Sequence, residues 1–222
     1  MSGVVVVAID GPAGSGKSTL ARALAMTLGV PYVNTGLMYR ALTLRALRER
    51  LELDDGPALA ELARRMRFDL DPRVEPPSLS IDGERPVDVL VSAEVESNVS
   101  RVASHLEVRA VLRAEQRRLG ERGAVLEGRD IGSVVFPDAS VKIYLQADPQ
   151  ARGARRARER EDAEQGSGVV EQLEARDALD AHVNPFVPPE DAVSIDTTGL
   201  DADRVLEVAL ELVQARTGRR GR

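Results

Sequence analysis

Length, composition and charge limit what this chain can be. Its 222 residues suffice for one or two domains with a buried core. A formal net charge of −6 argues against general nucleic-acid binding, which needs a large basic surface. The absence of cysteine excludes disulfides, thiolate metal sites and cysteine nucleophiles. No apolar stretch is long enough to cross a bilayer, so we expect a cytoplasmic protein that binds neither membrane nor nucleic acid.

The basic residues are almost all arginines. Lys17 and Lys142 are the only lysines, so 28 of the 30 basic residues are arginine. Arginine suits bidentate contacts with phosphate groups. Genome composition or heat adaptation produces the same bias, and we attribute most of it to such a cause.

A nucleotide-binding motif lies near the N-terminus. Residues 11–18 fit G-x-x-x-x-G-K-[ST], after the β-branched run Val4 to Ile9 and before the helix-forming segment Thr19 to Leu28. An ordinary glycine-rich turn would need all these features to coincide by chance. Lys17 is expected to reach the β- and γ-phosphates of ATP, and Ser18 to hold Mg²⁺. The residues expected to contact the ATP phosphates are Gly11, Pro12, Ala13, Gly14, Ser15, Gly16, Lys17, Ser18 and Thr19.

The segments after this motif predict a short strand and two helices. The strand, Pro31 to Asn34, leads into a helix with Thr35 near its N-cap, and a further helix covers Gly56 to Met66. Arg40 lies one turn into the first of these helices. At that position a solvated surface arginine and a ligand-binding arginine both fit the sequence.

The pattern changes between residues 67 and 90. Apolar and polar residues alternate there around several turn signals. We expect a small antiparallel insert of about three strands that does not belong to the parallel sheet. Two helices follow, over residues 92–103 and 106–119, and carry Ser100 and Arg109. From the pattern alone, both are surface residues.

A charged loop follows the next buried strand. The strand begins at Ala124, and Arg129 and Asp130 lie in the glycine-flanked loop that ends it. In open α/β sheets ligands bind at the carboxyl ends of strands, so these two residues lie where chemistry is expected. A local salt bridge is the alternative. Another strand covers Val141 to Ala147.

An arginine-rich helix begins at Asp148-Pro149. Some of its arginines have an acidic residue four positions on, which suits a salt-bridged surface. Arg152, Arg156 and Arg160 instead form a like-charged row, which is mildly destabilising unless an anion neutralises it. Residues 165–168 resemble the hinge of a mobile lid.

The C-terminal third contains one more candidate pair. Arg176 and Asp180 lie one turn apart on a helix, where a salt bridge and a ligand-binding role carry equal weight. A last strand over residues 192–196 and an amphipathic helix over residues 201–215 close the chain. His105 and His182 have no second candidate ligand at metal spacing, so we interpret both as structural or surface residues.

These features favour phosphoryl transfer to a small acceptor. Guanine-nucleotide switches usually carry N-K-x-D, and the two lysines leave no place for it. A phosphate monoester is already largely anionic near neutral pH, so such an acceptor needs no general base. Arginines and Mg²⁺ supply the charge neutralisation that the transfer requires.

Five blocks then point to one family. They are residues 11–19, Asn34-Thr35-Gly36 with Tyr39-Arg40, Glu-Gly-Arg-Asp-Ile-Gly at 127–132, Val-Phe-Pro-Asp-Ala at 135–139, and Arg176-Asp177 with Asp180. Together they make the chain similar to bacterial cytidylate kinases, which are nucleoside monophosphate kinases with a P-loop. The resemblance implies an α/β fold with a central parallel five-stranded sheet flanked by helices, a lid, and a monophosphate-binding subdomain that carries the antiparallel insert.

The resemblance also implies a division of the chain. The core P-loop domain would comprise residues 1–35, 120–147 and 185–217. Residues 36–119 would form the monophosphate-binding subdomain, with the insert at 67–90. Residues 148–184 would form the arginine-rich lid, and residues 218–222 a disordered tail.

The activity implied is transfer of the γ-phosphoryl group of ATP to CMP or dCMP, with Mg²⁺, by a monomer. The implied catalytic residues are Lys17, Arg129, Arg152, Arg155 and Arg156. The implied CMP-binding residues are Thr35, Tyr39, Arg40, Ser100, Arg109, Arg129, Asp130, Arg176 and Asp180. Among them Ser100, Arg109 and Asp130 would recognise cytosine, and Arg40 and Arg129 would hold the acceptor phosphate.

One departure and two alternatives accompany this interpretation. The family usually has another arginine shortly after Asp180, whereas this chain reads Ala-His-Val-Asn-Pro at 181–185. We hypothesise that Arg158 or Arg160 compensates. The alternatives are a P-loop kinase for another acceptor, such as UMP, AMP or a small hydroxy acid, and an ATP-binding regulatory protein without transfer activity.

Overall fold

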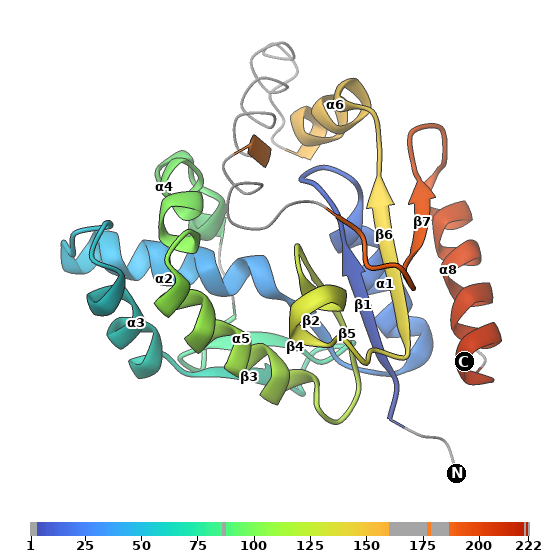
Figure 1. Ribbon diagram of the computed structural model, residues 1–222, viewed down its shortest axis with the longest axis horizontal. Coiled ribbons are helices and arrows are strands. Elements are labelled where there is room, and N and C mark those ends of the chain that lie inside the picture. Colours follow the sequence, from blue (N-terminus) through green and yellow to red (C-terminus); the bar gives the residue numbers. More distant parts are fainter. Residues whose placement is uncertain (1–3, 86–87, 160–176, 179–186, 220, 222) are drawn as a thin grey trace.

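A sheet of seven strands runs through the molecule in the order β3-β4-β2-β5-β1-β6-β7 (Figure 1). The computed structural model describes residues 4–85, 88–159, 177–178, 187–219 and 221. The strands are β1 (Val6–Asp10), β2 (Tyr32–Asn34), β3 (Phe68–Asp71), β4 (Ser78–Ile81), β5 (Ala124–Gly128), β6 (Val141–Gln146) and β7 (Val193–Asp196). Strands β2, β5, β1, β6 and β7 pair in parallel, which confirms the predicted five-stranded core.

Helices cover both faces of this sheet. They are α1 (Lys17–Leu28), α2 (Thr35–Glu49), α3 (Gly56–Arg65), α4 (Ala93–Ala103), α5 (Leu106–Gly120), α6 (Pro149–Glu159) and α8 (Ala202–Thr217). A 3₁₀ turn, η1 (Asp88–Val91), precedes α4, and one π-helical turn, η2 (Ile131–Val135), follows β5. The predicted hinge at 165–168 and residues 220 and 222 of the predicted tail lie outside the described residues.

The insert differs from its prediction in two ways. It has two strands, β3 and β4, which pair antiparallel from Phe68–Ile81 to Asp71–Ser78, and a single bridge joins Ile81 to Glu84. It also continues the main sheet, because β4 meets β2 at Tyr32 and the N–H of Tyr32 donates to the carbonyl of Pro77 at 2.8 Å. The exposed edge of β2 needs hydrogen-bond partners, and the hairpin supplies them.

The two faces of the sheet pack into separate cores. Side chains of a strand alternate between faces, so Val6 and Ala8 of β1 join one core while Val7 and Ile9 join the other. The first core contains apolar residues of α2, α3, α5 and the hairpin. The second contains those of α1 and α8; in Figure 1, α1 lies by β1 and β6, and α8 lies beside β7. The strands are therefore buried on both sides, as near-continuous apolar runs predict.

Capping side chains fix where the helices begin. Asn34 is the N-cap of α2, and its Oδ1 accepts from the N–H of Leu37 at 3.2 Å. Thr35, predicted near this cap, is the first helical residue. Ser92 caps α4 and Asp201 caps α8 in the same way.

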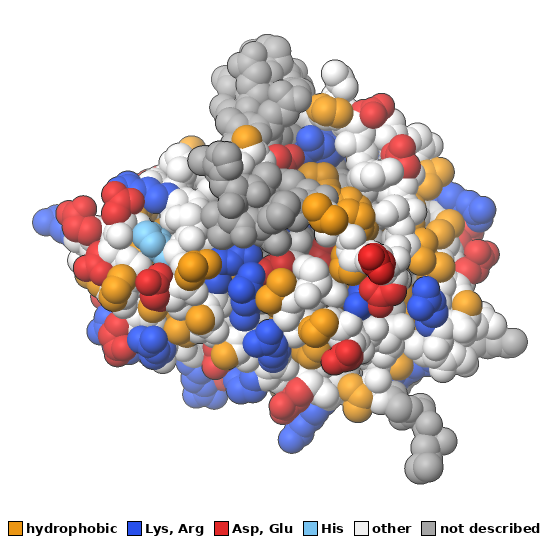
Figure 2. Space-filling view, in the orientation of Figure 1, with side chains coloured by type: hydrophobic (Ala, Val, Ile, Leu, Met, Phe, Trp, Pro, Cys, Tyr) orange, Lys and Arg blue, Asp and Glu red, His pale blue; other side chains and the backbone are white. Residues whose placement is uncertain are grey.

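Among the described residues no helix combines the length and the apolar character needed to cross a membrane. On the face drawn in Figure 2, acidic and basic side chains lie next to one another. This mixture agrees with the modest net charge of −6.

Candidate active site

The P-loop joins β1 to α1 and has the backbone geometry that its sequence predicts. Gly11, Gly14 and Gly16 have φ values of +147°, +73° and +93°, which disfavour residues with a side chain. A Cβ on Gly11 would lie 2.1 Å from the carbonyl oxygen of Leu145. The loop therefore lies closely against the end of β6 and leads into the start of α1, a position that favours an anion.

Two cations lie against this loop. Lys17 is buried, and its Nζ donates to the carbonyl of Pro12 at 2.6 Å. Arg129, after β5, donates from Nη1 to the carbonyl of Gly11 at 2.7 Å. Burial, followed by the charge of Arg129, lowers the pKa of Lys17 from 10.5 to about 7. The structure thus brings the predicted Lys17 and Arg129 together at the phosphate end of the site.

Glu127 is a buried acid beside the P-loop, to which no role was assigned from the sequence. Its Oε2 accepts from the hydroxyl of Ser18 at 2.9 Å, and its Oε1 accepts from the hydroxyl of Tyr32. Burial and this carboxylate raise the pKa of Tyr32, so the phenol keeps its proton. Its position at the end of a buried strand, within the 127–132 block, was the signal for this residue.

The oxygens of Ser18 and Glu127 suit Mg²⁺. Mg²⁺ prefers oxygen ligands and usually keeps several waters while it bridges one or two protein groups to substrate phosphates. Among the residues that the structure describes, no cluster of three or more His, Cys, Asp or Glu side chains forms a metal site. A Mg²⁺ ion held at Ser18 and Glu127 would take further ligands from the phosphates of the nucleotide.

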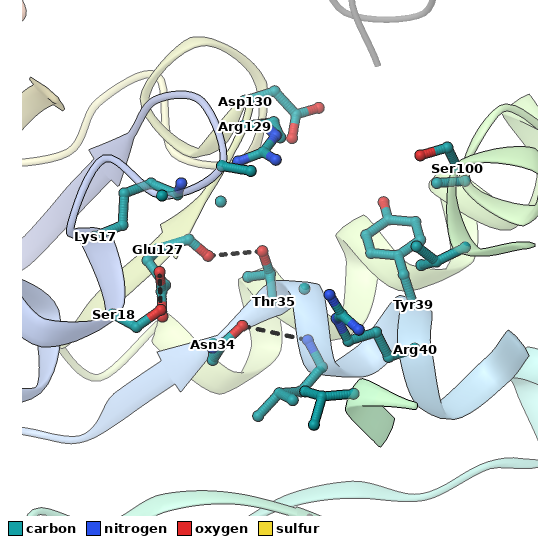
Figure 3. Close-up of a pocket in the computed structure, with 18 of the residues that line it drawn as sticks. Lys17, Ser18, Asn34, Thr35, Tyr39, Arg40, Ser100, Glu127, Arg129 and Asp130 are labelled. Atoms are coloured by element: carbon teal, nitrogen blue, oxygen red, sulfur yellow. Dashed lines mark hydrogen bonds between the residues drawn. The ribbon is translucent and has the colours of Figure 1, made fainter. Parts of the chain in front are cut away.

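A cleft of about 290 Å³ extends from the P-loop to α4 and α5 (Figure 3). In Figure 3, Lys17 and Arg129 lie on one side of it, and Tyr39, Arg40 and Ser100 lie across from them. Eleven of the predicted site residues line this cleft. They are Ala13, Gly14, Lys17, Ser18, Thr35, Tyr39, Arg40, Ser100, Arg109, Arg129 and Asp130.

The side of the cleft formed by α2 and α4 holds Arg40 in place. Arg40 is buried, which is contrary to a solvated surface arginine. Its Nη1 donates to the carbonyl of Leu90 at 2.9 Å, and its Nη2 to Oε1 of Glu96 at 2.8 Å. Thr35 donates its hydroxyl to the carbonyl of Glu127 at 2.7 Å, which ties the start of α2 to the end of β5.

Asp130 lies in a buried ion-pair cluster with α5. Its Oδ2 accepts from Nη2 of Arg109 at 2.8 Å and from Nε of Arg113 at 3.0 Å, and Nη2 of Arg113 also donates to it. Arg109 is 7% exposed, so its interpretation as a surface residue from the pattern alone is wrong. The helical pattern did not predict its burial, because Asp130, the acid that pairs with it, is 21 residues away in the chain.

A second buried acid anchors the loop that carries Asp130. Oδ1 of Asp10 accepts from the N–H of Ile131 at 2.9 Å, and Oδ2 from the N–H of Gly132 at 2.8 Å. Burial raises the pKa of Asp10 to about 6, although these two hydrogen bonds act in the opposite direction. The end of β1 thereby fixes the start of η2 directly after Asp130.

The helix α6 places two of the predicted lid arginines against the P-loop. Arg152 donates from Nη1 to the carbonyl of Ala13 at 3.0 Å and pairs with Asp177, whose Oδ1 accepts from the N–H of Ala13 at 3.3 Å. Arg155 donates to the hydroxyl of Thr197 at 2.8 Å, and the hydroxyl of Thr197 donates to the carbonyl of Ser15. The predicted residues that lie outside the described structure are the side chains of Arg156 and Arg158 and the whole of Arg160, Arg176 and Asp180.

Fold and site together define a class of protein. A parallel α/β sheet, a P-loop with its lysine and serine, and a cleft with arginines opposite are the parts of a P-loop kinase that acts on a small phosphorylated acceptor. A sequence profile described as cytidylate kinase matches residues 7–215. The chain belongs to the cytidylate kinase family and is an ATP-dependent nucleoside monophosphate kinase.

The chain is also similar to individual cytidylate kinases along nearly its whole length. A cytidylate kinase of Exiguobacterium sibiricum is 42% identical over 217 residues, which are 95% of this chain and 97% of the relative. One of Desulforamulus reducens is 43% identical over 217 residues, with 94% and 96% covered. A solved structure of an uncharacterized protein from Eubacterium ventriosum shares the fold, with a TM-score of 0.50 at 13% identity and coverage of 96% and 99%.

Proposed function

We propose that the protein transfers the γ-phosphoryl group of ATP to CMP or dCMP and releases ADP with CDP or dCDP. The observation that carries this proposal is the single cleft that connects the P-loop with the buried Asp130 cluster. A nucleotide acceptor has an anionic end and a base end. The cleft offers cations near the first and a carboxylate with an arginine near the second.

The two ends of the cleft suit the two ends of CMP. Arg40 and Arg129 supply positive charge for the acceptor phosphate, which needs no deprotonation before it attacks. Arg109, Asp130 and Ser100 would contact cytosine. A carboxylate accepts a hydrogen bond from the exocyclic amine of cytosine, whereas uracil presents a carbonyl at that position.

Mg²⁺ would be held by Ser18, with Glu127 directly or through a water, together with the phosphates of ATP. When bound, the ion neutralises charge on the transferring group. Lys17, the P-loop N–H groups and the arginines of α6 would position the triphosphate and exclude water. We assign residues 36–119 to the subdomain that binds the acceptor monophosphate and residues 148–184 to the lid.

We also infer that the protein acts in the cytoplasm and as a monomer. The cytoplasm holds its nucleotide substrates.

An acceptor panel tests the proposal directly. ADP formation from ATP and Mg²⁺ is measured with CMP, dCMP, UMP, AMP or no acceptor, for the natural protein and for Lys17→Ala. We expect turnover with CMP well above UMP and AMP, and its loss in Lys17→Ala. Tight ATP binding without CMP-dependent turnover would refute the proposal and favour a regulatory protein.

A further inference from the structure

Arg113 supplies most of the hydrogen bonds that Asp130 receives, although it was not among the predicted site residues. Its Nε donates to Oδ2 of Asp130 at 3.0 Å, and its Nη2 donates to the same oxygen. Arg109 donates one hydrogen bond to Asp130 from Nη2, and its Nη1 donates to the carbonyl of Ala103 at 3.3 Å. Arg113 does not line the cleft, whereas Arg109 and Asp130 do.

The hydrogen bonds are unevenly distributed over the carboxylate. All three donors from α5 reach Oδ2, and no described residue donates to Oδ1. Asp130 is 6% exposed, so its surroundings fix the orientation of its side chain. A carboxylate held through one oxygen presents the other one, with its acceptor capacity free, to the cleft that it lines.

The positions of the two arginines on α5 carry an electrostatic cost. Arg109 and Arg113 lie four residues apart on α5, where like charges repel. The carboxylate between them neutralises this repulsion, and charge-assisted hydrogen bonds to it are short and strong. A carboxylate that receives these hydrogen bonds has no donor of its own and serves as an acceptor only.

We propose that Arg113 is a specificity-determining positioning residue, which holds Asp130 through Oδ2 so that Oδ1 accepts from the exocyclic amine of the acceptor base. This inference rests on the proposed function, because it assumes that the cleft binds CMP. Arg113 itself touches no substrate. Its effect is therefore expected in the choice between cytosine and uracil and not in the transfer step.

The test compares steady-state kinetics of five variants with CMP and UMP as acceptors. Arg113→Gln removes the charge, and Arg113→Lys retains it with one donor group. Arg117→Gln is the matched control, because Arg117 lies one turn further along α5 and donates to the carbonyls of Val134 and Val135, not to Asp130. Asp130→Asn and its combination with Arg113→Gln complete a double-mutant cycle.

We expect Arg113→Gln to lower the ratio of kcat/KM for CMP to that for UMP by about tenfold, because a charged hydrogen-bond partner of Asp130 is lost. The change should come from KM for CMP, while kcat at saturating CMP and KM for ATP stay within about twofold. Arg113→Lys should restore part of the ratio. Arg117→Gln should leave it unchanged, and Arg113→Gln should have no further effect on it in the Asp130→Asn background.

Two results would overturn the inference while the proposed function stands. One is an unchanged CMP-to-UMP ratio in Arg113→Gln, and the other is an equal loss in Arg117→Gln, which would show that looser packing of α5 is the cause. Thermal unfolding of each variant shows whether it is folded. If Arg113→Gln does not fold, the CMP-to-UMP ratio of kcat/KM in Arg113→Lys decides the test. Absence of CMP turnover in the natural protein would instead refute the proposed function and this inference with it.

Discussion

Without a bound phosphate, the positive charge of Lys17 is in an unfavourable environment. Lys17 is buried beside Arg129, and its pKa is lowered to about 7 from an ordinary 10.5. The triphosphate of ATP favours the ammonium form, so binding raises this pKa again. The free energy of ATP binding is therefore linked to protonation of one side chain.

This linkage gives a pH dependence with a definite sign. Below pH 7 Lys17 is already charged, so ATP affinity should not depend on its proton. Above pH 7 the free protein must take up a proton on binding, and affinity should fall by up to about tenfold per pH unit. Calorimetry with MgATP at pH 8 in buffers of different ionisation enthalpy measures the uptake. A signal that is independent of the buffer, or uptake that persists in Lys17→Met, would contradict the prediction.

Asp130 allows a second test at the scale of one atom. Asp130→Asn replaces an acceptor-only group with one that also donates, so it accommodates the uracil carbonyl better. We expect the preference for CMP over UMP, as a ratio of kcat/KM, to fall by about tenfold or more. An unchanged ratio in a folded variant would show that another group selects the base.

Some residues of the site were predictable from the sequence and others were not. Lys17 and Ser18 were predictable because a local motif with fixed spacing defines them. Glu127 and Arg113 were not assigned, because their partners Ser18 and Asp130 are 109 and 17 residues away. Such contacts exist only once the strands and helices have assembled, so spacing along the chain carries little information about them.

At the scale of elements, the P-loop depends on how closely β6 approaches it. Gly11→Ala would place a methyl group 2.1 Å from a carbonyl oxygen of Leu145, at a φ of +147°. Backbone atoms cannot yield as a flexible side chain does. We expect the free energy of unfolding to fall by at least about 3 kcal/mol, with loss of ATP binding, as measured by urea unfolding and calorimetry.

Gly83 offers the matched control for this prediction. It has a φ of +82°, but a Cβ there would have no atom within 4 Å. Gly83→Ala should therefore lose only the conformational part, about 1–2 kcal/mol, and should keep its kinase activity. Equal losses in the two variants would show that the contact with Leu145 is unimportant.

The link from β1 to η2 can be tested in the same way. Asp10→Ala leaves the N–H groups of Ile131 and Gly132 buried without an acceptor, so unfolding should become easier by about 2–4 kcal/mol. Because these groups follow Asp130, KM for CMP should rise more than KM for ATP. Asp138→Ala, an exposed acid just beyond η2, serves as the control. A larger rise in KM for ATP would contradict this account.

The elements themselves were largely predictable, and the exception has a physical cause. Apolar runs and helix-start signals located the parallel strands and most helices to within a few residues, and the structure shows that Ser92 and Asp201 cap two of these helices. The hairpin β3–β4 was predicted as a separate insert. Its attachment to β2 depends on backbone hydrogen bonds at Tyr32, and backbone groups are the same in every sequence.

For the whole molecule, we expect activity from the monomer, without assembly into an oligomer. Sedimentation should give a single species near the chain mass of 24.0 kDa, with or without ATP and CMP. Specific activity should not change when the protein is diluted. Activity that falls on dilution, together with a heavier species, would show that a second copy contributes to the site.

The division of the sheet into two cores has a consequence for the evolution and engineering of this enzyme. Neighbouring residues in β1, such as Val6 and Val7, belong to opposite cores, so each strand carries two interleaved sets of constraints. A chimera that exchanges residues 36–119 alone would separate the new α2, α3 and α5 from the strand side chains on which they pack. A successful exchange of acceptor preference must also carry the alternate residues Val6, Ala8, Val33, Ala124 and Leu126 from the same donor sequence.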